Sequence, residues 1–328
     1  MRALPKAHLH LHLDGSFPRP AVAALLARRG LPFAPPERFA NVDDFFAAYV
    51  TVPNLVADVD ELAGLCRALV VAESRQGVVY LEPAVEPQLY APRLGTIDDV
   101  LAVMCAAFTS AAIDRDVEVG ALVTVNTDGG TEGASELAHL AASYAGRGVV
   151  AFGTAGFVEP ANLARFVEPV AIARAAGLDV VCHAGQTGGP ASVIDALDNL
   201  HPDRIAHGVH AARDPALMRR LAGEGVVCDV CPTSNVALGV VADLASHPLP
   251  VLVAAGVAVT LNADDELWFG ASISDQYELA RTAFGFDDAT IAGIARTGGR
   301  ASGMSQGMRE RLERGVAAWL EEPRELTS

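Results

Sequence analysis

The stretch His8-Leu9-His10-Leu11-His12-Leu13-Asp14-Gly15-Ser16 decides how this sequence is interpreted. Side chains alternate between the two faces of a β-strand, so the three histidines are predicted to share one face and the three leucines the other. Two imidazoles spaced two residues apart on a strand can reach one ion, an arrangement that suits zinc. The alternative interpretation is a strand that simply has one polar face.

Composition narrows the classes of protein to which this chain can belong. It has 328 residues, 51% of them hydrophobic, and a net charge of −16, enough for one large α/β domain or two smaller ones. The acidic balance argues against a nucleic-acid partner, whose phosphates need a basic surface. Five scattered cysteines predict no disulfide framework. We find no signal peptide or long apolar run, so we expect a cytoplasmic protein without a membrane span.

Short apolar runs alternate along the chain with longer segments of helical composition. Eight such strands alternating with helices predict a parallel sheet with crossover connections. At this length, eight strands favour a closed (β/α)₈ barrel of the TIM type over an open doubly wound sheet. We see no domain boundary and expect a single barrel domain over residues 1–328. The predicted strands cover residues 4–13, 78–83, 117–126, 148–153, 178–183, 204–208, 226–231 and 257–262.

Polar residues with metal-binding chemistry lie where four of these strands end. The carboxyl ends of the strands in such a barrel form one mouth, so these residues are predicted to converge there. Three imidazoles and a carboxylate would form a zinc shell with room for water, and the ion would lower the pKa of that water toward ~7. A second aspartate could accept the water's proton. The alternative for the aspartate pair is a simple acidic loop. The residues are His10, His12, His183, His207, Asp264 and Asp265.

At this point the sequence resembles the adenosine deaminase family of metal-dependent amidohydrolases. The matching pieces occur in the family's order and together are specific. The resemblance implies a hydrolytic deaminase that acts on an adenine nucleoside or related aminopurine, a small-molecule substrate, with the oligomeric state left open. The pieces are Pro5-Lys6-Ala7-His8-Leu9-His10-Leu11-His12-Leu13-Asp14-Gly15-Ser16, His183-Ala184-Gly185, Arg204-Ile205-Ala206-His207-Gly208-Val209, Cys231-Pro232-Thr233-Ser234-Asn235 and Leu261-Asn262-Ala263-Asp264-Asp265.

The resemblance also implies a role for each residue of the site. One zinc ion per chain would be bound by three histidines and one aspartate, namely His10, His12, His183 and Asp264. His207 and Asp265 would orient and activate the attacking water. Asp14 would contact the ribose of a nucleoside, and the backbone at Gly156 would meet the purine ring.

One position departs from the family motif. Where the family has His-Ala-Gly-Glu, this chain reads His183-Ala184-Gly185-Gln186. The family's glutamate passes a proton to the purine ring, which an amide cannot do, although Gln186 can still donate or accept a hydrogen bond. Loss of a positioned general acid costs roughly 10²–10⁴ in rate. Three explanations stay open: an engineered Glu-to-Gln change, a divergent amidohydrolase that cleaves a C–N bond of another substrate, or a catalytically silent nucleoside-binding protein.

Further polar residues receive interpretations of their own. His8 is interpreted as a hydrogen-bonded histidine of the barrel floor rather than a fourth ligand. Glu266 stands where the family more usually has proline, and we interpret it as solvated rather than as a replacement acid. Glu82 and Glu86 lie near a strand end and could line the mouth.

Overall fold

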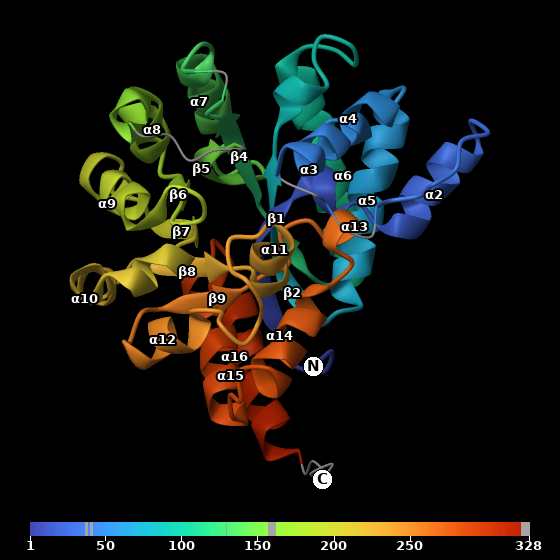
Figure 1. Ribbon diagram of the computed structural model, residues 1–328. Coiled ribbons are helices and arrows are strands. Elements are labelled where there is room, and N and C mark those ends of the chain that lie inside the picture. Colours follow the sequence, from blue (N-terminus) through green and yellow to red (C-terminus); the bar gives the residue numbers. More distant parts are fainter. Residues whose placement is uncertain (37–38, 40–41, 129, 157–161, 323–328) are drawn as a thin grey trace.

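The computed structural model describes residues 1–36, 39, 42–128, 130–156 and 162–322. Its strands form one sheet in the order β1-β2-β4-β5-β6-β7-β8-β9, with a short β3 paired to β2, and every pairing is parallel. Helices surround the sheet (Figure 1). The predicted (β/α)₈ barrel is confirmed. The strands are β1 Lys6–His12, β2 Val78–Val85, β3 Glu118–Val119, β4 Ala121–Asn126, β5 Val149–Ala155, β6 Asp179–Ala184, β7 Arg204–His207, β8 Val227–Val230 and β9 Val259–Leu261.

Helices fill the connections between the strands and follow the last strand. The longer ones agree with the sequence pattern, whereas several single turns were not predicted. They are α1 Leu13–Ser16, α2 Arg19–Ala27, α3 Val42–Tyr49, α4 Thr51–Leu55, α5 Val59–Ser74, η1 Pro87–Leu89, α6 Ile97–Arg115, α7 Ala134–Ser143, η2 Leu163–Phe166, α8 Val167–Ala175, α9 Gly189–Asn199, η3 Val209–Arg213, α10 Pro215–Glu224, α11 Pro232–Ala237, α12 Leu249–Ala254, α13 Glu266–Phe269, α14 Ile273–Thr282, α15 Asp288–Ala301 and α16 Gln306–Glu321.

Side-chain caps explain where several of these helices begin. Thr96 accepts a hydrogen bond from the backbone N–H of Asp99, whose carboxylate bonds back to Thr96, which is a complete capping box for α6. Ser272 and Asp275 form the same motif at α14. The segment between β5 and β6 contains two helices in direct succession, the short η2 and then α8. Pro169 stands in the first turn of α8, the part of a helix that tolerates a missing N–H.

The two faces of the barrel wall have different compositions. Leu9 and Leu11 of β1 are fully buried in the main apolar core. A separate cluster of small and branched residues from successive strands packs together. In the described ranges, no helix has the length and apolar character needed to cross a bilayer. The separate cluster is Ala84, Leu122, Ala151, Val181 and Ala206.

The barrel closes between β1 and the segment after β9. The backbone N–H of Asp264 donates to the carbonyl of His10 at 3.1 Å, and that of His12 donates to the carbonyl of Asp264 at 3.0 Å. The side-chain oxygen of Asn262 accepts from the N–H groups of Leu9, at 2.8 Å, and His10, at 3.1 Å. The seam of the barrel therefore fixes the strand that carries the histidines against the loop that carries the aspartates.

A buried charge network fills the barrel beneath this seam. Arg204 is 1% exposed and pairs with Glu82 and with Asp229, whose Oδ2 lies 2.9 Å from Nε. Asp229 also accepts from Thr260 at 2.6 Å, and Thr260 accepts from Asn262 at 2.7 Å. Glu82 therefore belongs to the barrel interior and not to the mouth. A buried ion of this kind is stable only while its partners remain.

Removal of the central cation should expose that dependence. We expect Arg204→Met to destabilise the fold by about 3–5 kcal/mol, because two carboxylates would stay buried without a counter-charge. The control is Arg220→Met, which breaks the surface pairs to Glu224 and Asp198 and should cost less than about 1 kcal/mol. Urea unfolding of both variants measures the difference, and equal costs would contradict a structural role for the network.

Candidate metal and substrate site

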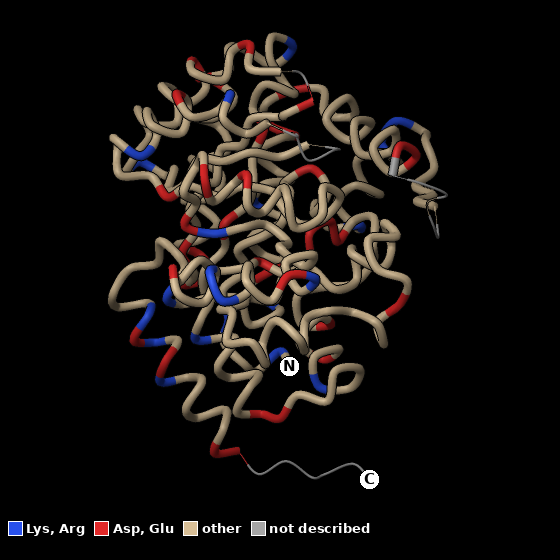
Figure 2. Tube along the Cα trace, turned by 60° about the vertical axis from the view of Figure 1, so that its left-hand side comes forward, with Lys and Arg blue, Asp and Glu red and all other residues tan. Residues whose placement is uncertain are grey.

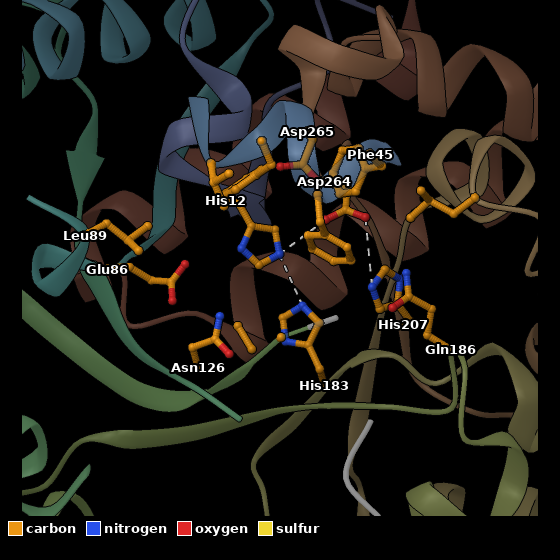
Figure 3. A pocket seen from close by; sticks show the side chains of 16 residues that line it. His12, Phe45, Glu86, Leu89, Asn126, His183, Gln186, His207, Asp264 and Asp265 are labelled. Carbon is orange, nitrogen blue, oxygen red and sulfur yellow. Dashed lines mark hydrogen bonds and ion pairs between the residues drawn. The ribbon is translucent and has the colours of Figure 1, made fainter. Parts of the chain in front are cut away.

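Three imidazoles and one carboxylate meet at the C-terminal mouth of the barrel. His10 and His12 come from β1, His183 from β6 and Asp264 from the loop after β9. Asp264 Oδ1 lies 3.3 Å from Nε2 of His10 and 3.4 Å from Nε2 of His12. Nε2 of His12 and Nε2 of His183 are 3.2 Å apart (Figure 3). The structure therefore brings together the four residues that the sequence analysis assigned to zinc.

The hydrogen bonds behind these imidazoles fit a metal site. Nδ1 of His10 donates to the carbonyl of Asp229 at 3.0 Å, and Nδ1 of His183 donates to that of Thr154 at 2.7 Å. A carbonyl only accepts, so both Nε2 atoms present lone pairs to the centre. Nε2 of His10 is buried without a hydrogen-bond partner. Tetrahedral ligands at ~2.0–2.1 Å from zinc lie about 3.4 Å apart, which matches the separations observed here.

Burial sets the charge of the cluster. It lowers the pKa of His12 to about 4 and also lowers the pKa of His183, so both imidazoles are neutral, as metal ligands must be. Burial opposes ionisation of Asp264, but the neighbouring His10, His207 and His12 hold its pKa well below the usual value. The pKa of His10 is raised, because the Asp264 carboxylate outweighs burial. The cluster thus offers an ionised carboxylate beside nitrogen lone pairs.

His207 is oriented by a chain of hydrogen bonds from outside the mouth. The N–H of Leu249 donates to Nδ1 of His247 at 3.1 Å, so Nε2 of His247 carries the proton and donates to Asn235 Oδ1 at 3.2 Å. The Asn235 amide then donates to Nδ1 of His207 at 3.2 Å. This leaves the proton on Nε2 of His207, which faces Asp264 Oδ2 at 3.9 Å. Sequence reasoning missed His247, which lies in a loop with no metal-like spacing.

Asp265 lies next to this cluster in a closely packed position. Burial and the neighbouring Asp264 raise its pKa well above the usual value, which makes its carboxylate a stronger base. Its Oδ1 is buried without a hydrogen-bond partner. A Cβ at Gly15 would lie 1.6 Å from that oxygen, so only glycine allows α1 to approach the aspartate.

Two residues of the site have strained backbones. His207 has a φ of 71° and Asp264 a φ of 66°, in the left-handed region that residues other than glycine rarely adopt. Each such conformation costs about 1–3 kcal/mol and persists only where its surroundings enforce it. The strain turns both side chains toward the same centre.

A cavity of about 630 Å³, including its open mouth, lies above the cluster. Gln186, His207 and Asp265, to which the family resemblance gives catalytic roles, all line it. Gly156 also lines it, and a Cβ there would lie 2.6 Å from the Thr127 hydroxyl, so the backbone itself forms that wall. Apolar side chains from the neighbouring helices and loops complete the lining, namely Phe45, Phe46, Tyr49, Val50, Leu89, Ala155 and Leu238.

The remaining candidates occupy other positions. Asp14 is 1% exposed and is not one of the residues that line the cavity; its Oδ1 accepts from the hydroxyl of Tyr90, and its Oδ2 is buried without a hydrogen-bond partner. Glu86 lines the cavity. In the sequence analysis it was only one of two glutamates near a strand end.

A second buried polar cluster supports the aspartate loop from below. His8 is a hydrogen-bonded floor residue, as predicted: Nδ1 donates to Glu73 at 2.8 Å and Nε2 accepts from the N–H of Ala263 at 3.0 Å. Glu266 was interpreted as solvated, and this was wrong. Its carboxylate accepts from the N–H of Ile273 at 3.0 Å and lies in one cluster with His8 and Glu73. Glu266 and Glu73 are 193 residues apart in the sequence, so a local sequence pattern could not predict that they lie together.

Acidic and basic residues are distributed along the whole chain trace (Figure 2). Among the described residues, no second cluster contains three histidines.

The sequence profile of the adenosine deaminase family matches residues 5–319. A putative adenosine/adenine deaminase of Streptomyces coelicolor is 38% identical over 332 residues, covering 97% of each chain. The crystal structure of adenine deaminase from Arthrobacter aurescens superposes with a TM-score of 0.89 at 27% identity, covering 97% of this chain and 100% of that one.

The metal site predicts a gain in stability on zinc binding. A ligand present at 100 times its Kd stabilises a fold by about 2.7 kcal/mol, or about 4 °C in Tm for a chain of this size. We expect chelator-treated protein to show this rise on addition of zinc, and His183→Ala to lose it. The surface variant His139→Ala is the control. Differential scanning fluorimetry and metal analysis measure the effect, and an equal rise in all three proteins would contradict the site.

Proposed function

This chain belongs to the adenosine deaminase family, and on that premise we propose that it is a zinc-dependent hydrolytic deaminase of an adenine nucleoside or related aminopurine. The observation that carries the proposal is the convergence of four metal-type ligands with His207, Asp265 and Gln186 at one cavity. The names of the Streptomyces and Arthrobacter relatives support an adenine-type substrate.

His10, His12, His183 and Asp264 would hold one zinc ion. Bound there, the ion supplies Lewis acidity that makes a water molecule nucleophilic near neutral pH. The chain contributes the two neighbouring groups. Asp265, which lines the cavity next to Asp264, accepts the proton of the attacking water. His207 presents an N–H at Nε2, which holds the water oxygen on the side facing the reacting carbon.

Substrate binding divides between Gln186 and the cavity walls. The Gln186 amide donates a hydrogen bond to the ring nitrogen beside the amino-bearing carbon, and the Gly156 backbone lies along the purine. Asp14 would contact the ribose of a nucleoside only if that ribose extends as far as the Asp14–Tyr90 pair. Since an amide has no proton to transfer, the chain as it stands is slow in this reaction.

Gln186 also favours a second candidate. A substrate that needs no ring protonation would be hydrolysed at its C–N bond by the same site, with Gln186 serving only for recognition. A catalytically silent nucleoside-binding protein would hold the purine in the same place without turnover. These two alternatives and the proposed deaminase predict different results when a carboxyl is restored at position 186.

Restoration of the acid separates these candidates. We expect Gln186→Glu to raise the deamination of adenine or adenosine by about 10²–10⁴-fold, because a carboxyl can protonate the ring nitrogen. Ammonia release from both substrates is the measurement, and Gln306→Glu on the exposed face of α16 is the control. A substituted protein that stays inert, while the original chain converts another amine, would establish the divergent C–N hydrolase instead.

The proton on His207 can be tested separately. Asn235→Asp keeps the shape of the side chain but presents only acceptors, so it draws the His207 proton to Nδ1. We expect kcat to fall about 10- to 100-fold in the Gln186→Glu background. Asn54→Asp, an exposed substitution, is the control. Nitrogen-15 NMR of the histidines reports the tautomer directly, and an unchanged tautomer with lowered kcat would contradict this explanation.

A further inference from the structure

Glu86 is an acidic residue of the cavity that the proposed reaction does not use. It follows the end of β2 and begins the turn into η1. The residue is 5% exposed and lines the cavity beside the apolar Leu89. Asp264 and Asp265, the other carboxylates in the lining, both belong to the metal end. Glu86 is therefore a polar group placed in the substrate cavity with no role yet assigned.

No cation compensates this carboxyl among the residues that the structure describes. Its Oε1 accepts a hydrogen bond from the Gln88 amide at 3.4 Å, and the same amide nitrogen donates to the carbonyl of Thr124 at 3.0 Å. Burial, and then the carboxylates of Asp14 and Asp128, raise the pKa of Glu86 to about 8. A carboxyl buried without a cation costs stability, so its presence in a cavity indicates a function.

The position of Glu86 in the cavity indicates which part of a substrate it meets. Figure 3 shows its carboxyl turned toward the cavity on the side of His12, across from Gln186 and His207. The amino-bearing carbon must lie by His207 and Gln186, where the proposed reaction takes place. Glu86 consequently faces the remote edge of the purine.

Asn126 completes a polar wall at this edge. It ends β4, the neighbour of β2 in the sheet, and also lines the cavity. Its Oδ1 accepts from the N–H of Asp128 at 2.8 Å, which leaves the amide nitrogen to donate into the cavity. Figure 3 shows that nitrogen on the side of Glu86. The wall thus presents an acceptor next to a donor.

We propose that Glu86 determines substrate specificity by accepting a hydrogen bond from the edge of the purine remote from its amino group, with Asn126 donating to an acceptor beside it. This inference rests on the proposed function. A substrate that pairs with both Glu86 and Asn126 carries a hydrogen-bond donor next to an acceptor. Free adenine offers its N9–H beside N3, and a nucleoside offers ribose hydroxyls. Glu86 lines the cavity at this edge, whereas Asp14 is not among the lining residues and its Oδ1 accepts from Tyr90.

Three substrates test the inference. Adenine carries the ring N–H, adenosine carries hydroxyls, and 9-methyladenine has neither while keeping the reacting end unchanged. We expect kcat/KM in the Gln186→Glu background to favour adenine or adenosine over 9-methyladenine by about 10- to 100-fold, the range expected when a buried polar group loses its hydrogen-bond partner. The favoured substrate identifies the donor.

Variants of Glu86 should then remove that preference. Glu86→Leu should lower kcat/KM for the favoured substrate to the level of 9-methyladenine, chiefly through KM, and leave 9-methyladenine almost unchanged. Glu86→Gln keeps an acceptor and should retain part of the preference, which also covers the case in which the leucine variant does not fold. Exposed Glu136→Gln is the control.

The outcomes separate the two proposals. The role of Glu86 is overturned, and the proposed function is not, by either of two results. The first is a substrate preference that is the same with Glu86, Leu or Gln at position 86. The second is the absence of any preference against 9-methyladenine before Glu86 is changed. If calorimetry detects no binding and ammonia assays no conversion of any of the three purines, the proposed function fails and this inference fails with it.

Discussion

The closure of the barrel and the assembly of the metal-type cluster depend on the same few hydrogen bonds. The Asp264 backbone joins β1 to the segment after β9, while its side chain faces the histidines of β1. A change in register at this seam would turn His10 and His12 to the opposite face of the wall. The strained φ of Asp264 is tolerated because bonds on both sides hold it. The geometry of the site is therefore a property of the closed barrel.

Polar groups inside the barrel transmit that constraint from the floor to the mouth. Arg204 forms an ion pair with Asp229, and the backbone carbonyl of Asp229 accepts a hydrogen bond from Nδ1 of His10. From the same aspartate, Thr260 and Asn262 lead to the backbone of β1. Burial of apolar side chains in the barrel interior would cost less free energy than burial of these charged groups. The network instead includes the residue whose carbonyl fixes the tautomer of His10, which apolar packing cannot do.

The two ends of the cavity follow different physical rules. At the metal-type end, burial lowers the pKa of His12 and His183, while the neighbouring histidines hold the pKa of Asp264 low. At the opposite end, Glu86 is buried with no compensating cation among the described residues. In the proposed reaction, the chain itself would supply the groups at the first end, and the substrate would supply the hydrogen-bond donor to Glu86 at the second.

The sequence by itself determined the strands and the metal-type residues. Short apolar runs bounded by turn residues favour strands, and an alternating His-Leu pattern fixes which side chains share a face once the strand forms. The family resemblance then joined His183 and Asp264 to that strand. Single-turn helices such as α1 and α13 could not be predicted, because one turn has too few residues to show a helical period.

Only the tertiary structure decided what surrounds these residues. His247 orients His207 through Asn235, Glu266 joins His8, and Asp14 turns to Tyr90 rather than to the cavity. None of these pairs has a local spacing that a sequence pattern could reveal. The physical reason is that hydrogen-bond partners and burial depend on how distant segments pack. The tautomer of an imidazole and the cost of a buried carboxyl are fixed by those neighbours alone.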